Sequence, residues 1–244
     1  MPRKRVRILG IRVDDVTTSE TLALMERFIA EGTPHQIVTL NPEFIMEAQR
    51  NPAFRVVLEE ASLAIPDGYG VLWAARILGQ PLRERVAGSD LLPLVAHLSA
   101  KKGYRLFLLG AAPGVAAKAA QILQEQNPGL QIAGTYAGSP APEEEERIIQ
   151  RVVKVRPDFL FVAYGAPHQD LWIHRNLAQL GVPVCMGVGG AFDFIAGIVP
   201  RAPLWMRKRG LEWLYRLWRQ PWRWRRMLAL PHFAYRVLWD RFWH

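Results

Sequence analysis

The sequence is poor in cysteine. Its 244 residues contain one, Cys185, which lies in the apolar segment 182–187. One cysteine cannot form a disulfide within its own chain, and sparse cysteine is typical of proteins in a reducing compartment. We therefore expect Cys185 to be an unreactive thiol in a buried strand of a cytoplasmic protein.

Long apolar runs and metal-binding motifs are also missing. No stretch of about 18 consecutive apolar residues is present, so the sequence predicts no helix that spans a membrane. The short apolar run at residues 6–13 lacks the pattern of a signal peptide. The six histidines are scattered without zinc-site spacing. We therefore expect neither a structural nor a catalytic metal site.

Net positive charge is absent from the first 200 residues and concentrated at the end of the chain. Residues 201–244 carry eleven Lys and Arg against two acidic residues, and this accounts for the net charge of +9. The same segment holds seven of the nine tryptophans. The composition predicts a neutral core at 1–200 and an Arg/Trp-rich helical appendage at 201–244.

Within the core, short apolar segments alternate with amphipathic helices. Thr17 and Glu20 have the spacing of a capping box at the start of one such helix. Strands are expected at residues 5–13, 36–40, 63–66, 104–109, 130–135, 158–163 and 182–187. This alternation predicts an α/β, Rossmann-like, largely parallel sheet with helices on both faces.

Ligands of such sheets bind beyond the carboxyl ends of the strands. The residues of interest there are Thr39, Asn41, Asp67, Gly110, Tyr136, Gln169 and Asp193. Asp67 directly follows an apolar strand, so its carboxylate is a candidate general base. The alternative is that Asp67 caps the next helix.

Two features suggest a phosphate ligand, and each has a plain alternative. Gly110 and Gly114 precede a helix, whose first N–H groups favour an anion, yet the spacing fits a simple tight turn equally well. Arg83 and Arg85 could hold a diphosphate through their guanidinium groups. They could equally be surface charges.

Several motifs occur in a fixed order along the chain. They are Thr39-Leu-Asn41-Pro-Glu43, Pro66-Asp67-Gly68-x-Gly70-Val71, Glu84-Arg85-Val-x-Gly88-x-Asp90-Leu91, Pro167-x-Gln169, Gly187-Val-Gly189-Gly190-x-Phe192-Asp193, Gly197, Arg201-Ala202-Pro203 and Leu211-Glu212-Trp213-Leu-x-Arg216. Over about residues 6–226 the chain resembles the WecG/TagA/CpsF glycosyltransferases, glycosyltransferase family 26.

The resemblance implies a sugar transfer at the cytoplasmic face of the membrane. The donor would be a UDP-sugar and the acceptor undecaprenyl-diphosphate-linked N-acetylglucosamine. Transfer would invert the anomeric centre without a metal or other cofactor, in synthesis of wall teichoic acid or a related surface polysaccharide. The expected sugar is N-acetylmannosamine; its uronic acid, glucose and galactose are alternatives. Since the family includes dimers, we expect a homodimer or other homo-oligomer.

The resemblance also assigns roles to residues of this chain. Asp67 matches the catalytic base, and Arg85 matches an arginine of the pocket. Thr39, Asn41 and Gln169 match residues near the sugar, and Gly110, Tyr136 and Asp193 are further expected substrate-binding residues. Arg216, Arg223 and Arg226 match arginines that meet the lipid diphosphate. The family often has Gln-Glu where this chain has Gln169-Asp170, so the role of that carboxylate is open.

The appendage has the pattern of helices that lie on a membrane. Apolar residues recur at helical spacing at 211, 214, 215 and 218 and again at 235, 238, 239 and 242, with arginines on other faces. Pro221 and Pro231 predict a division into two or three short helices. We expect docking on the anionic inner face of the plasma membrane. The alternative is that these aromatic residues pack on the core.

Two other classes of protein share some of these features. A nucleic-acid-binding protein would use Arg for phosphates and Trp for stacking, but it would leave the Asp67 motif without a role. A nicotinamide-dependent oxidoreductase would have the glycine fingerprint of the Rossmann fold, which is missing here. We therefore expect no nucleic-acid partner and no nicotinamide cofactor.

Overall fold

The computed structural model describes residues 4–219, 221 and 224–243, without the side chains of residues 204, 208, 216, 225 and 226. The strands are β1 (Arg5–Ile8), β2 (Ile11–Asp14), β3 (His35–Leu40), β4 (Leu63–Pro66), β5 (Arg105–Gly110), β6 (Gln131–Tyr136), β7 (Phe159–Ala163) and β8 (Val184–Gly187). The helices of the first 200 residues are α1 (Thr18–Glu31), α2 (Pro42–Ala48), α3 (Pro52–Glu60), α4 (Tyr69–Ile77), α5 (Gly88–Lys102), α6 (Val115–Gln126), α7 (Pro142–Val155), α8 (His168–Leu180) and α9 (Ala191–Ile195).

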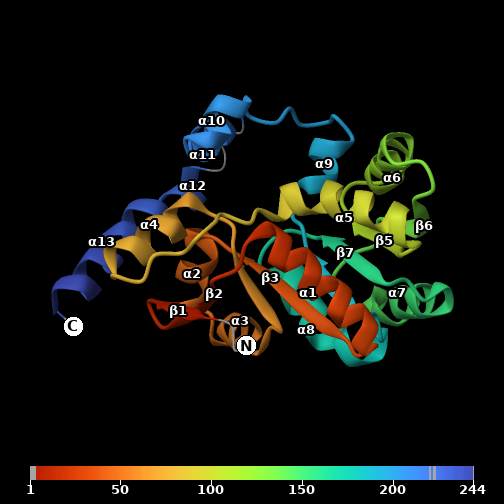
Figure 1. Ribbon diagram of the computed structural model, residues 1–244, viewed down its shortest axis with the longest axis horizontal. Coiled ribbons are helices and arrows are strands. Elements are labelled where there is room, and N and C mark those ends of the chain that lie inside the picture. Colours follow the sequence, from red (N-terminus) through yellow and green to blue (C-terminus); the bar gives the residue numbers. More distant parts are fainter. Residues whose placement is uncertain (1–3, 220, 222–223, 244) are drawn as a thin grey trace.

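Six strands form one parallel sheet in the order β4-β3-β8-β7-β5-β6 (Figure 1). Along β7, Phe159 and Phe161 belong to one hydrophobic cluster, and Leu160 and Val162 belong to another. This alternation is the two-residue period of a strand, so both faces of the sheet are buried.

Helices cover the two faces. One face packs against α1, α5, α6 and α9, and the opposite face of β5, β7 and β8 packs against α7 and α8. The expected α/β fold with a parallel sheet between helices is therefore confirmed. Cys185 is buried in β8, and burial raises the pKa of its thiol.

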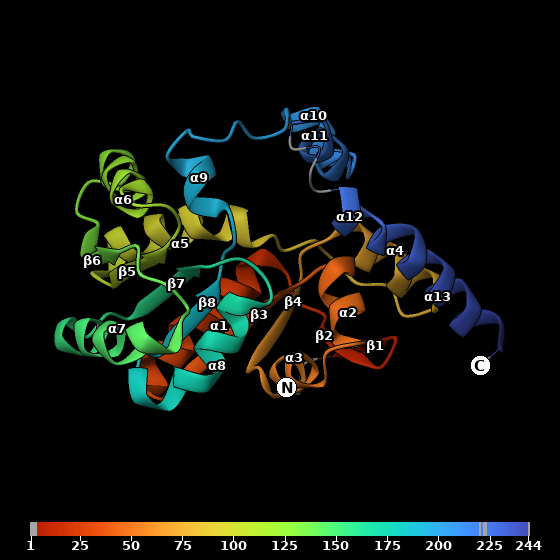
Figure 2. The same ribbon diagram turned by 180° about the vertical axis from the view of Figure 1, so that it is seen from behind.

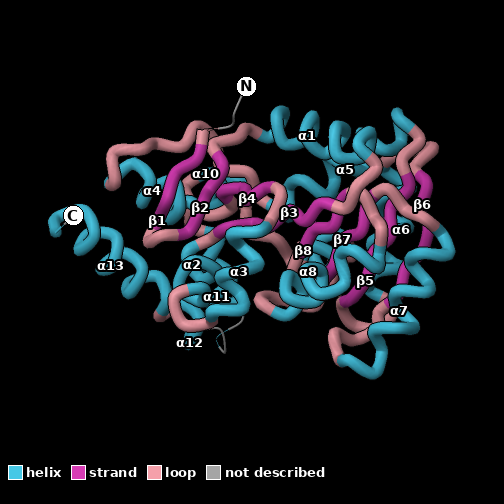
Figure 3. Tube along the Cα trace, turned by 90° about the horizontal axis from the view of Figure 1, so that it is seen from below, coloured by secondary structure: helices cyan, strands magenta, loops and turns pink. Residues whose placement is uncertain are grey.

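The N-terminal segment differs from the expectation. Instead of one strand at 5–13, β1 and β2 form an antiparallel hairpin with Leu9 and Gly10 at the turn, both at positive φ. Turns with two positive φ angles match the twist of a hairpin, and Gly10 meets that requirement without strain. Figure 3 shows the hairpin beside β4, at the end of the large sheet.

The other predicted elements are confirmed with small shifts at their ends. The expected strand at 36–40 begins at His35, and the one expected at 182–187 begins at Val184. The capping box is present: the Thr17 side chain accepts from the Glu20 N–H, and the Glu20 carboxylate accepts from the Thr17 N–H. Burial of the apolar face of α1 then fixes this helix against the sheet.

The chain after residue 200 forms α10 (Leu204–Lys208), α11 (Glu212–Arg219), α12 (Trp224–Met227) and α13 (Ala229–Trp243). The division expected at Pro221 is present between α11 and α12. The one expected at Pro231 is wrong, because this residue lies in the first turn of α13. Proline fits there because the first N–H groups of a helix have no partner within it. None of the helices in the described residues is long and apolar enough to cross a membrane.

Helix α13 contacts the core, whereas α10 and α11 stand away from the sheet (Figure 1). Phe233 and Val237 are buried in a hydrophobic cluster with residues of α2, α3 and α4. Figure 2 shows α13 running beside α4. The outer side of α13 leaves large apolar residues exposed: Tyr235, Leu238, Trp239 and Phe242. Some of the tail aromatics therefore pack on the core, as the alternative states, and others face outward. Docking on a membrane stays a prediction.

Candidate active site

A cavity of about 590 Å³ lies at the carboxyl ends of β3, β4 and β8 and is bounded by the helices after residue 200. Its polar lining includes Thr39, Asn41, Asp67, Arg85, Ser89, Gln169, Asp193, Arg207 and Glu212. Six of the residues expected to bind or transform a substrate therefore line one cavity: Thr39, Asn41, Asp67, Arg85, Gln169 and Asp193. The parallel sheet brings them together because it aligns the ends of its strands.

Asp67 lies directly after β4 on the cavity wall. Its backbone N–H donates to the carbonyl of Leu40 at 2.8 Å, which holds the loop after β4 against β3. The cap residue of α4 is Gly68, and no described side chain caps this helix. The capping alternative for Asp67 is therefore wrong. Its carboxylate remains partly exposed and lies 3.9 Å from Nη1 of Arg85.

Thr39 lies near the end of β3, and Asn41 follows the last residue of this strand. Asn41 caps α2, since its Oδ1 accepts from the backbone N–H of Phe44 at 3.0 Å. This bond fixes the side chain. The oxygen is used by the cap, so the amide N–H₂ group is the part that can donate to a ligand. Thr39 is nearly buried, with Gly88 of α5 packed close to its methyl group.

Gln169 joins two loops of the cavity. Its Oε1 accepts from the backbone N–H of Gly165 at 3.2 Å and from that of Gly189 at 3.0 Å. A Cβ at Gly187 would lie 2.5 Å from Nε2 of Gln169, so only glycine allows the end of β8 to approach this amide. With both N–H groups on Oε1, the orientation of the Gln169 amide is fixed.

Asp170, the neighbour of Gln169, is fully buried. Burial raises the pKa of its carboxyl from 3.8 to about 7, and the nearby Gln169 side chain offsets part of this effect. The folded protein therefore holds this proton more tightly than the unfolded chain. Stability from this group is present below pH 4 and is lost as the pH rises through about 7.

Replacing Asp170 with Asn should remove this pH dependence, because the amide is neutral throughout. We expect the variant to exceed the wild type in free energy of unfolding by about 1–4 kcal/mol at pH 8 and to match it near pH 4. Urea unfolding at the two pH values measures this difference. A variant with the same pH dependence as the wild type would show that Asp170 is not the group concerned.

Asp193 lies in the first turn of α9 and lines the cavity, as Gln169 does. Burial raises the pKa of its carboxyl, and backbone hydrogen bonding opposes this shift. Its backbone carbonyl accepts from the N–H groups of Ile198 and Val199, which turns the chain towards the appendage. Asp193 therefore connects the end of β8 to the segment that leads out of the core.

Arg85 lies between Asp67 and a cluster of charges. Its Nη2 lies 3.1 Å from Oδ2 of Asp90, and its guanidinium carbon lies 5.1 Å from the ring centroid of Tyr69. The other oxygen of Asp90 lies 2.6 Å from Nη2 of Arg201 and 3.7 Å from Nη1 of Arg207. One carboxylate thus gathers three arginines, and two of these line the cavity.

Arg83 has a different surrounding from Arg85. Its guanidinium group pairs with the carboxylates of Asp15 and Glu20, at 3.2 and 2.6 Å. These bonds hold the loop before α5 to the start of α1. The alternative that Arg83 is a structural surface charge is therefore the correct one.

Two predicted residues, Gly110 and Tyr136, lie outside the cavity lining. They end β5 and β6, which follow β7 towards the far edge of the sheet. A Cβ at Gly110 would lie 2.8 Å from backbone atoms of Ala163, so this glycine allows β5 and β7 to pack. The Tyr136 ring lies under the guanidinium group of Arg151, at 4.6 Å. Substrate binding by either residue stays a prediction.

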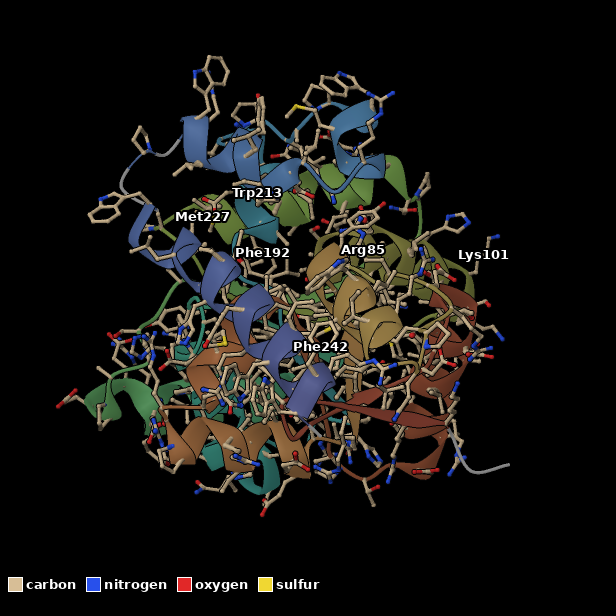
Figure 4. All side chains as sticks on the ribbon, turned by 90° about the vertical axis from the view of Figure 1, so that its left-hand side faces the viewer. Arg85, Lys101, Phe192, Trp213, Met227 and Phe242 are labelled. Carbon is tan, nitrogen blue, oxygen red and sulfur yellow. The ribbon has the colours of Figure 1, made fainter. Side chains whose placement is uncertain are left out.

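The three tail arginines cannot be placed in the cavity. Arg223 lies outside the described residues, and the side chains of Arg216 in α11 and Arg226 in α12 are likewise not described. The structure instead brings Arg207 to the cavity, together with Glu212 and Trp213 of α11. Figure 4 shows Trp213 and Met227 on the appendage side, apart from Arg85. Sequence reasoning missed Arg207, because its carboxylate partner, Asp90, lies more than a hundred residues away.

The cavity offers cationic and hydrogen-bonding groups rather than a cluster of metal ligands. In the part of the chain that is described, no three His, Cys, Asp or Glu side chains are grouped so that they could hold a metal ion. Arg85 and Arg207 are the cationic groups that line the described cavity. Guanidinium groups suit phosphate oxygens, which they bind through paired N–H donors.

Known proteins resemble the chain over nearly its whole length. Residues 6–244 match the model of the glycosyl transferase WecG/TagA/CpsF family. An N-acetylglucosaminyldiphosphoundecaprenol N-acetyl-beta-D-mannosaminyltransferase of Bacillus spizizenii is 37% identical over 93% of this chain and 87% of its own. Proteins of the same name from Bacillus subtilis and Staphylococcus aureus are 35% and 32% identical, over 88% and 96% of this chain and 83% and 92% of their own. The chain belongs to the WecG/TagA/CpsF family of glycosyl transferases.

Proposed function

We propose that this enzyme transfers N-acetylmannosamine from its UDP donor to undecaprenyl-diphosphate-linked N-acetylglucosamine. The observation that carries the proposal is Asp67, a partly exposed carboxylate beside Arg85 in the cavity. The names of the relatives support both the sugar and the acceptor. The products would enter wall teichoic acid or a related surface polysaccharide.

The reaction needs a base and a stabilised leaving group. A hydroxyl oxygen of the acceptor sugar attacks the anomeric carbon of the donor, and the Asp67 carboxylate takes the hydroxyl proton. The bond between the anomeric carbon and the UDP oxygen breaks, and UDP leaves with the electron pair. Attack opposite the leaving group inverts the anomeric centre. We propose that Arg85 and Arg207 meet the charge on the diphosphate, so that no metal ion is required.

A donor panel tests the proposal. The purified enzyme is incubated with a short-chain diphosphate-linked N-acetylglucosamine and UDP-N-acetylmannosamine, its uronic acid, UDP-glucose or UDP-galactose, with EDTA present. We expect transfer from UDP-N-acetylmannosamine at the highest kcat/KM. A higher kcat/KM with another UDP-sugar would show that this sugar is the donor instead. A lack of transfer from every donor would contradict the proposal.

We further propose that the enzyme docks on the inner face of the plasma membrane through α13 and the basic segment around it. The outer side of α13 exposes Tyr235, Leu238, Trp239 and Phe242, the last with 78% of its surface accessible. Aromatic side chains favour the headgroup layer, and each nearby Arg adds about 1 kcal/mol on anionic lipid.

Flotation with vesicles measures this docking. The wild type should float with anionic vesicles but not with zwitterionic ones, and Trp239→Ser should weaken flotation about tenfold or more because it removes a large interfacial side chain. Val153→Ser provides a control, since it changes an exposed apolar residue on α7. Equal flotation of both variants would contradict the assigned surface. Salt-sensitive binding of an oligonucleotide without flotation would favour a nucleic-acid partner.

A further inference from the structure

The cavity changes character along its length. Asp67, Arg85 and Arg207 lie in its polar part, whereas the lining contributed by α2, α4, α12 and α13 is mostly apolar. We define the apolar end of the cavity by five residues that line it: Tyr69, Trp73, Leu230, Phe233 and Ala234. A sugar and a diphosphate would leave this part without a ligand of matching chemistry.

Around the start of α4, the residues that line the cavity change from polar to apolar along the chain. Asp67 precedes the helix and lies 3.9 Å from Arg85, and the Arg85 guanidinium group lies over the ring of Tyr69, the first residue of α4. One turn further along the helix is Trp73, which still lines the cavity and has 38% of its surface exposed. The apolar end therefore extends from the residues beside Arg85 along α4 to Trp73, which is partly exposed.

Helix α13 forms the opposite wall. Leu230, Phe233 and Ala234 have the spacing i, i+3 and i+4, so they share one face of the helix, and α13 runs beside α4 (Figure 2). The other side of the same helix exposes Trp239 and Phe242. A ligand that leaves the cavity between α4 and α13 would thus emerge beside an exposed apolar surface.

We propose that the apolar end of the cavity binds the first isoprenoid units of the acceptor's polyprenyl chain. This inference rests on the proposed function, since it concerns the same acceptor. In that acceptor the polar sugar and diphosphate precede the prenyl chain, and the cavity likewise presents the polar groups around Asp67 before Tyr69 and Trp73. The apolar end and the polar part belong to one cavity, so one ligand can occupy both.

Acceptors that differ only in their lipid test the proposal. N-acetylglucosamine diphosphates bearing an ethyl, a geranyl or a farnesyl group are compared in solution without vesicles, below the concentration at which they form micelles. Each buried methylene contributes roughly fourfold to binding. We expect kcat/KM of the wild type to rise about tenfold or more from the ethyl to the farnesyl acceptor.

Variants of the apolar end should reduce this ratio selectively. Trp73→Ala and Leu230→Gln should lower kcat/KM for the farnesyl acceptor about tenfold while changing that for the ethyl acceptor about twofold or less. Trp73→Phe should retain most of the preference, because it keeps an aromatic wall. Leu94→Ala, at an exposed position on α5, is the control and should behave as the wild type.

Two outcomes would overturn the inference. One is a wild-type kcat/KM that does not depend on the lipid; the other is a Trp73→Ala variant that loses activity equally on all three acceptors. Both leave the proposed function intact, since the ethyl acceptor is still used by the wild type. An absence of transfer to all three acceptors would instead contradict the proposed function, and the inference with it.

Discussion

Replacing Asp67 with Asn should lower kcat about 10²–10⁴-fold while the affinity for UDP stays within about twofold. The amide has nearly the same shape as the carboxylate but cannot take the proton of the acceptor hydroxyl. The capping residue of α4 is Gly68, so the substitution leaves the start of this helix unchanged. Initial rates with a short-chain acceptor, together with calorimetric titration of UDP, measure the two effects separately.

Asp158→Asn is the matched control for this experiment. Asp158 lies at the opposite end of β7, where its Oδ2 accepts from the backbone N–H of Arg105 at 2.7 Å. An amide oxygen can accept the same bond, so this variant should transfer sugar at the wild-type rate. Near-normal turnover in Asp67→Asn would remove Asp67 from the role of base.

Replacing Arg85 with Ala should lower kcat about 10²–10³-fold, because removal of one donor that stabilises developing charge has an effect of this size. It also leaves one oxygen of Asp90 without its partner at 3.1 Å. Arg85→Lys keeps the charge but loses the paired N–H groups, so it should recover only part of the rate. Initial rates over a range of UDP-sugar concentrations separate the effects on kcat and KM.

Arg83→Ala serves as the control, because Arg83 lies two residues away and pairs with Asp15 and Glu20 outside the cavity. Loss of these partly exposed ion pairs should cost at most about 1 kcal/mol of stability and leave transfer unchanged. If Arg83→Ala were as inactive as Arg85→Ala, the loss of activity would come from a change in the shape of the loop before α5. It would not then show a role for the Arg85 charge.

The parallel sheet was predictable because its strands are short, apolar and regularly spaced. The hairpin of β1 and β2 was not predictable, because its turn at Leu9 and Gly10 lies inside an apolar segment with the pattern of a single strand. The prediction that Pro231 separates two helices was also wrong. Proline ends a helix when it lies in the interior, but it is compatible with the first turn, which is its place in α13.

In the candidate site, the residues at strand ends were predictable and the contacts across the chain were not. Asp67 and Gln169 follow strands, so the topology alone places them at one edge of the sheet. The grouping of Arg85, Arg201 and Arg207 around Asp90 depends on how the segment after residue 200 folds back. The place of Trp73 in the lining was not predicted, and an aromatic residue on a helix is more often part of the core.

The anomeric configuration of the product tests the central claim most directly, because a single attack by the activated acceptor hydroxyl opposite the leaving group inverts the anomeric centre. Product made from UDP-N-acetylmannosamine, whose sugar is α-linked, is isolated, and its new linkage is assigned by NMR from the one-bond carbon–proton coupling at the anomeric centre. We predict a β linkage in all of the product. An α linkage would show retention, and Asp67 could not then act only as the base that activates the acceptor.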